Sequence, residues 1–160
     1  MSEGLNKILL EVSAFYDSIE RCRVSTTFNA ADYQDAYNRL NRVTERYVHE
    51  KENGRLEAHE DQALEDVLER DPFIKGMRHA RIIGEHVQKT RGETPVILLT
   101  TNTCPIPLLA ETSAGSFFSG PTAIARDVQG KMYFVNHLAQ LREAEKRLRQ
   151  AVARATNNLP

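Results

Sequence analysis

Residues 29–54 read NAADYQDAYNRLNRVTERYVHEKENG, and this stretch decides much of the fold. Its apolar side chains recur at steps of three and four residues, at Tyr33, Ala36, Leu40, Val43 and Tyr47. That spacing places one apolar stripe on an α-helix and is typical of a helix packed lengthwise along a neighbour. Asn29 supplies an N-cap, and Asn53-Gly54 supplies a helix end. We therefore predict a long helix over 30–51 with its stripe in the core.

Similar periodicity marks further helices on both sides of this stretch. Residues 3–22 predict a long N-terminal helix that Ser2 can cap. Residues 57–70 predict a shorter, strongly acidic helix, and we expect its acidic residues to face water: Glu60, Asp61, Glu65, Asp66 and Glu69. Asp71-Pro72 then provides a cap and a first-turn proline for a helix to about residue 89. Asn136 can cap a long C-terminal helix that ends near residue 155.

The character of the chain changes between residues 94 and 135, where charges become rare. Residues 96–101 are β-branched or apolar and predict a buried strand. The prolines of Cys104-Pro-Ile-Pro lack ladder donors, which argues against a central strand there. Residues 122–135 predict a hairpin whose loop uses Gly130 at positive φ.

Together these elements predict an α+β fold that is mostly α. We expect four to five helices, of which the N-terminal, second and C-terminal ones are long, packed with a small antiparallel or mixed sheet formed by residues 95–135. The length of 160 residues, with 41% hydrophobic and 27% charged residues, suits one globular domain over 1–160.

Composition also limits the setting in which the chain works. No apolar run is long enough to cross a bilayer, and residues 1–7 lack the features of a signal peptide. The two cysteines, Cys22 and Cys104, cannot form a disulfide framework and suggest reduced thiols. We therefore expect a cytoplasmic protein with no membrane partner.

Charge is distributed unevenly, although the formal net charge is only -1. Residues 1–74 hold nine Lys and Arg against sixteen Asp and Glu, whereas residues 75–160 hold twelve against six. The two halves can neutralise each other within one fold, or the basic half can serve a partner. The basic candidates lie on the helices expected over about 73–90 and 137–155: Lys75, Arg78, Arg81, Lys89, Arg91, Arg142, Lys146, Arg147 and Arg149. Glu143 and Glu145 lie four residues before Arg147 and Arg149, so intrahelical ion pairs are the alternative use of these arginines.

Motifs for chemistry are largely missing from the sequence. His79 and His86 are seven residues apart, which is too far along a helix to share a metal ion. Gly130-Lys131 lacks the spacing of a phosphate-binding loop. Cys104 follows a predicted strand and His137 starts the last helix, so a Cys–His pair is the one catalytic arrangement to consider. We expect no cofactor and no metal.

The sequence therefore favours a non-enzymatic adaptor, regulator or inhibitor that binds another macromolecule, with a protein or a second copy of the chain as the preferred partner. A nucleic-acid-binding regulator that uses the two basic helices is the alternative. A small enzyme or ligand-binding domain centred on Cys104 is a further alternative. The nearly uncharged segment 94–122 is either core or an exposed binding surface.

Overall fold

The computed structural model describes residues 1–78, 94–99, 105–110, 118, 120–126 and 132–157. Three long helices dominate it: α1 (Glu3–Val24), α2 (Ala30–Glu52) and α5 (His137–Thr156). A shorter helix, α3 (Ala58–Leu68), follows α2, and residues 72–78 are also helical. The predicted mostly helical class is confirmed. Where a predicted helix end falls on described residues, it differs from the observed end by at most two positions.

The predicted helix caps are present and explain where the helices begin. The Ser2 side chain accepts a hydrogen bond from the Leu5 amide, and the Asn29 side chain accepts from Ala31 and Asp32. Asn136 does the same for α5 by accepting from Ala139. Each bond satisfies an amide that has no partner within its helix.

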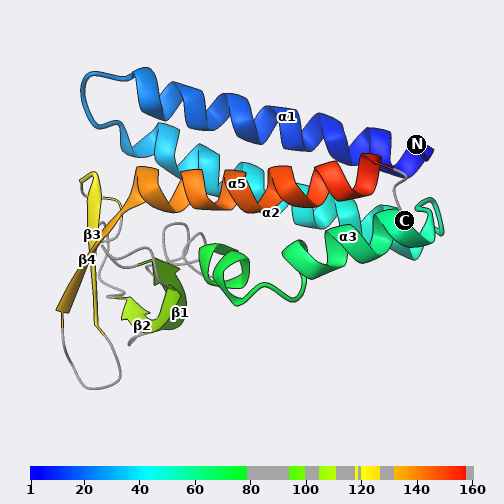
Figure 1. The fold of residues 1–160 in the computed structure, drawn as a ribbon. Helices are drawn as coiled ribbons and strands as arrows, with labels where there is room; N and C mark the ends of the chain where they lie inside the picture. Colours follow the sequence, from blue (N-terminus) through cyan, green and yellow to red (C-terminus); the bar gives the residue numbers. More distant parts are fainter. Residues whose placement is uncertain (79–93, 100–104, 111–117, 119, 127–131, 158–160) are drawn as a thin grey trace.

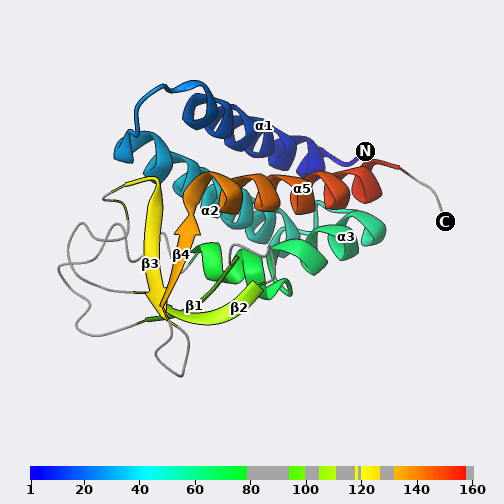
Figure 2. The same cartoon turned by 60° about the vertical axis from the view of Figure 1, so that its left-hand side comes forward.

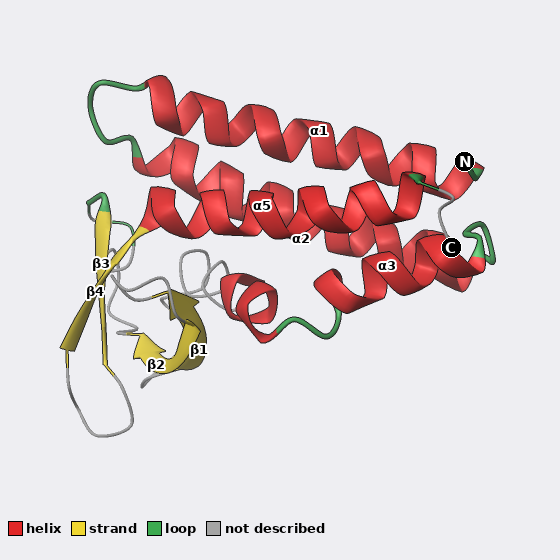
Figure 3. Ribbon diagram, in the orientation of Figure 1, coloured by secondary structure: helices red, strands yellow, loops and turns green. Residues whose placement is uncertain are grey.

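The helices form a bundle in which α1, α2 and α5 run lengthwise, as Figures 1 and 3 show. The start of α1 and the end of α5 lie at one end of the bundle, and α3 packs against α5 near that end. The apolar stripes meet in a continuous core. All five stripe residues of α2 are at most 7% exposed, and Leu141, Ala144 and Leu148 of α5 are fully buried.

One close contact fixes the approach of the α2–α3 connection to α1. The Gly4 amide donates to the Arg55 carbonyl at 3.2 Å, and a Cβ built on Gly4 would lie 2.4 Å from that oxygen. Any larger residue at position 4 would therefore push the two segments apart.

Four strands gather at the end of the bundle where α5 begins (Figure 2). They are β1 (Thr94–Leu99), β2 (Pro105–Ala110), β3 (Thr122–Arg126) and β4 (Met132–Asn136), and they pair antiparallel in chain order. Over 122–135, where the sequence predicts a hairpin, β3 pairs with β4 from Thr122–Asn136 to Arg126–Met132. The predicted loop residue Gly130 lies outside the described residues.

Strand β2 corrects the expectation that the prolines keep residues 105–107 out of a central strand. β2 lies between β1 and β3, and it pairs with β1 over its whole length. Its described pairing with β3 joins Leu109 to Arg126 and Ala110 to Ala125. Successive residues of a strand direct their amides to opposite sides. Pro105 and Pro107 are two residues apart, so they remove donors from only one side of β2 and leave the amides of its other side intact.

A buried polar junction joins the strands to the bundle, because β4 runs directly into α5 at His137. The His137 amide donates to the Pro121 carbonyl at 3.0 Å, and its ring Nδ1 lies 3.0 Å from the Tyr37 hydroxyl. The ring also stacks on Phe118, with centroids 4.9 Å apart. His137 is fully buried, so it is part of the structural core.

Candidate interaction surface

The structure divides the predicted basic residues into three groups. Arg81, Lys89 and Arg91 lie outside the described residues, as does Cys104. Arg78 and Arg147 take part in contacts between elements of the chain, described below. The remaining described candidates are exposed at the surface: Lys75, Arg142, Lys146 and Arg149.

Arg147 holds α5 against the start of the helix at 72–78. Its Nη1 donates to both carboxylate oxygens of Asp71, at 2.8 and 2.9 Å, and its Nε donates to Glu143 at 3.0 Å. Its guanidinium lies 4.7 Å from the centroid of the Phe73 ring. Partial burial lowers the pKa of Arg147, but the bonds to Glu143 and Asp71 outweigh that effect and raise it. The charge of Arg147 is therefore used inside the chain.

Arg78 has a similar internal contact, because its Nε donates to Asn41 of α2 at 3.2 Å. Asn41 in turn donates to Glu45 at 2.8 Å. This chain of bonds links the helix at 72–78 to α2, so Arg78 also contributes to the assembly of the bundle.

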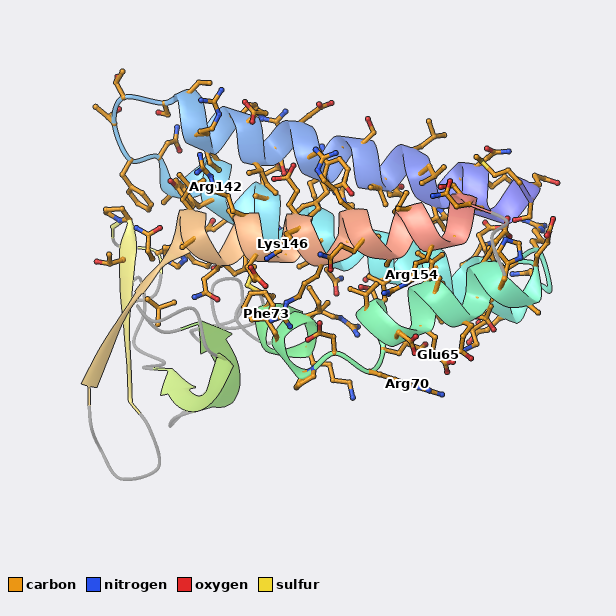
Figure 4. All side chains as sticks on the ribbon, viewed as in Figure 1. Glu65, Arg70, Phe73, Arg142, Lys146 and Arg154 are labelled. Atoms are coloured by element: carbon orange, nitrogen blue, oxygen red, sulfur yellow. The ribbon has the colours of Figure 1, made fainter. Side chains whose placement is uncertain are left out.

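The outward side of α5 is different, because each of its exposed charged side chains is basic. We call this surface the basic face; it consists of Arg142, Lys146, Arg149 and Arg154. Figure 4 shows Arg142, Lys146 and Arg154 along the helix. The two acidic residues of α5, Glu143 and Glu145, are only 23% exposed. Each is bonded to an arginine of the same helix, so neither places a free carboxylate on the basic face.

Within the described part of the chain, Arg142, Lys146 and Arg154 form no ion pair. Arg142 is near Glu20 of α1, whose pKa is lowered first by its hydrogen bond to Arg23 and to a smaller extent by the charge of Arg142. Uncompensated like charges in a row raise the local potential. The basic face is therefore suited to an anionic partner.

Arg149 is held in a fixed position by two neighbours. Its Nε and Nη2 donate to Glu145 at 3.0 and 2.7 Å, and its guanidinium lies 3.9 Å from the centroid of the Tyr16 ring on α1. The side chain is nevertheless 58% exposed. Burial of Tyr16 raises its pKa to about 12, so it stays neutral beneath the arginine. A cation that is already ordered loses little entropy when a partner binds.

The acidic helix α3 shows the opposite arrangement, because carboxylates of this helix and of its C-cap residue Glu69 have cationic partners within the chain. Lys51 of α2 lies 3.6, 3.3 and 3.5 Å from carboxylates of Asp61, Glu65 and Glu69. It also donates to the Tyr47 hydroxyl at 3.2 Å, and these contacts raise the pKa of Lys51.

Glu60 corrects the sequence interpretation of α3, in which its acidic residues all face water. Its carboxylate is fully buried and accepts hydrogen bonds from the Ser2 amide, the Ser2 hydroxyl and the Glu57 amide. Burial raises the pKa of Glu60, but these three bonds have the larger combined effect and lower it. One carboxylate thus caps α3 and anchors the start of α1.

Other groups of polar residues offer weaker sites. Two hollows of about 270 and 320 Å³ are both lined by Glu45 and His49 of α2, and each also has charged side chains of both signs in its lining. Small-molecule sites are mostly apolar and more enclosed. Glu57, His59 and Glu60 are close enough to share a cation, but the bonds described above already use the Glu60 carboxylate. Cys22 is a free, buried thiol whose pKa burial raises to about 11, so it is a poor nucleophile.

The sequence prediction included Arg142, Lys146 and Arg149 of the basic face. It did not distinguish them from Arg78 and Arg147, which make contacts within the chain. Arg154 is not among the predicted site residues. A helical projection offers a usable signal: Arg142, Lys146 and Arg149 lie opposite the apolar residues Leu141, Ala144 and Leu148. The contact of Arg149 with Tyr16 has no sequence signal, since it joins residues 133 positions apart.

No described helix is long and apolar enough to span a membrane. The chain matches no protein-family model, and neither curated proteins nor solved structures include one that is significantly similar.

Proposed function

We propose that this protein is a non-enzymatic interaction domain that binds an acidic surface of another protein through the basic face of α5. The observation that carries the proposal is the sign of the most exposed charges on that helix: Arg142, Lys146, Arg149 and Arg154 are exposed, whereas Glu143 and Glu145 are partly buried and bonded to arginines. Charge complementarity between this face and an acidic partner surface would mainly accelerate association and select the partner. The role is that of an adaptor, regulator or inhibitor, and we place it in the cytoplasm because of the low cysteine content.

The dimensions of the basic face favour a protein over a nucleic acid. It is a strip one helix wide, and α-helices are about 10–12 Å across including side chains. An exposed carboxylate of α1, that of Glu20, lies close enough to Arg142 for the two charges to interact. A duplex that approached α5 would bring its wider array of phosphates toward this carboxylate. A protein partner can place its acidic groups on the strip alone.

The proposal is tested with two probes of equal charge: an unstructured glutamate-rich peptide and a single-stranded DNA, each labelled for fluorescence anisotropy. We expect the peptide to bind and its affinity to fall as salt rises, because exposed charges are screened. Stronger DNA binding with the steeper salt dependence would support the nucleic-acid alternative. Lack of binding to either probe at low salt would contradict both.

Two triple variants locate the binding surface. Arg142→Gln/Lys146→Gln/Arg149→Gln removes three charges from the basic face. Lys7→Gln/Arg21→Gln/Arg42→Gln removes three charges from α1 and α2, so the net charge changes by the same amount. The first variant should lose most of the peptide affinity and the second should keep it. Equal losses would show that net charge, and not the basic face, attracts the peptide.

A further inference from the structure

We infer that the partner segment is itself an α-helix, with acidic side chains on one face, that lies along α5. This inference rests on the proposed function and names the form of its partner. Three observations support it: the spacing of the cations, the small exposed residues at either end of them, and the fixed orientation of Arg149.

The spacing of the cations is that of one helical face. Arg142, Lys146 and Arg149 occupy positions i, i+4 and i+7 of α5 and lie opposite its buried stripe. At 1.5 Å per residue, they extend over about 10 Å of the helix axis, with Arg154 about 7–8 Å further along. Glutamates at i, i+3 or i+4, and i+7 of a second helix have the same axial spacing. Two such helices can therefore align several opposite charges at once, as flanking positions of coiled coils do.

Small side chains flank these cations along the helix. Ala139 precedes Arg142 and Ala153 follows Arg149, and both are exposed. Small residues allow a helix axis to approach to about 8–10 Å. The aliphatic stems of Arg142 and Lys146 can then cover apolar side chains of the partner while their charged ends reach its carboxylates.

Arg149 gives this surface a fixed reference point. Its stacking on Tyr16 and its bonds to Glu145 direct the guanidinium, and no described contact uses Nη1. A partner carboxylate can therefore accept from Nη1 without displacing Glu145. Because Tyr16 belongs to α1, the register of the partner is set by the packing of α1 against α5 as well as by α5 alone.

The inference is tested with two synthetic peptides of identical composition. In the first, alanine-rich peptide, glutamates recur at i, i+4 and i+7, so they lie on one helical face. In the second, the same residues are rearranged so that the glutamates are distributed around the helix. We expect the first peptide to bind at least about fivefold more tightly, and to gain helical circular dichroism signal when the protein is added.

A third peptide with proline at its centre keeps the glutamates but cannot form a continuous helix. It should bind as weakly as the rearranged peptide. Tyr16→Leu should reduce the preference for the first peptide while leaving affinity for the rearranged peptide nearly unchanged, since it removes the support of Arg149 and no charge.

The outcomes separate this inference from the proposed function. Equal affinity for all three peptides, with loss of binding in Arg142→Gln/Lys146→Gln/Arg149→Gln, would overturn the helical partner and keep the acidic one. Absence of binding to every peptide would overturn the proposed function as well. Binding of the first peptide that is unaffected by the triple substitution would show that a different surface recognises it.

Discussion

Helices α3 and α5 are both densely charged, yet they use their charges in opposite ways. On α3, the carboxylates of Asp61, Glu65 and Glu69 surround the ammonium group of Lys51 from α2. On α5, Arg142, Lys146 and Arg154 have no such partner among the described residues. The comparison shows that the role of a charged helix face depends on the elements packed beside it. Exposed ion pairs within one helix contribute little stability by themselves.

The largest expected effect is on the free energy of unfolding, and it distinguishes the buried side of α5 from its exposed side. Leu148 is fully buried, and Leu148→Ala should lower the free energy of unfolding by about 2–5 kcal/mol through lost burial and the resulting cavity. Lys146→Ala, two residues away on the exposed side, should change it by no more than about 0.5 kcal/mol. Urea denaturation followed by circular dichroism measures both. Similar losses for the two variants would mean that the basic face stabilises the fold and is not reserved for a partner.

The next effect concerns the buried carboxylate of α3. Glu60→Gln should lower the free energy of unfolding by about 1–3 kcal/mol at neutral pH, because amide and hydroxyl donors lose a charged acceptor. Asp66→Asn, at an exposed position of the same helix, is the matched control and should have little effect.

The same variant has a defined pH dependence. The pKa of Glu60 in the folded chain is below its ordinary value of 4.5. Its contribution to stability is therefore fully present above about pH 4.5 and is lost as the pH falls through the lowered folded pKa. The difference between the wild type and Glu60→Gln should shrink in acid. A difference that stays constant from pH 7 to pH 3 would contradict the assignment.

Substitution of the two lysines tests the comparison directly. Lys51→Met leaves three carboxylates facing one another, so its midpoint of thermal unfolding should fall. Lys146→Met removes an unpaired charge and should leave the midpoint unchanged. Added salt should reduce the defect of Lys51→Met, since it screens the repulsion. Equal midpoints for the two variants at low salt would refute the distinction between compensated and free charges.

The smallest expected difference in stability lies within α5 itself. Arg147→Gln should cost up to about 1 kcal/mol, because it breaks the bonds to Asp71 and Glu143 at a partly exposed site. Arg142→Gln should cost less than about 0.5 kcal/mol. Binding of the acidic peptide should rank the variants in the opposite order, with Arg142→Gln the more damaging. The same ranking in both measurements would leave no basis for assigning the two arginines different roles.

Much of the helical part of the fold could be predicted from local patterns. The stripes at Leu40 and Leu148, the caps at Ser2, Asn29 and Asn136, and the start at Asp71-Pro72 all depend on residues a few positions apart. Phe28 and Tyr33, which lie on either side of the α2 N-cap, are also in contact, with ring centroids 5.0 Å apart. The central position of β2 was not predictable in this way, because it depends on which strands pair on either side of it.

By itself, the sequence determined where the described helices begin, which apolar stripe of each long helix is buried, and that α5 carries an excess of positive charge. These features follow from helical periodicity and capping, which act within a few residues of each other. Only the tertiary structure decided which charges remain free. Arg147 is compensated by Asp71, 76 residues away, and Lys51 by carboxylates of the next helix, whereas Arg142 and Lys146 face outward. Coulombic interactions act through space, so the packing of helices, and not the order of residues, determined which cations are available to a partner.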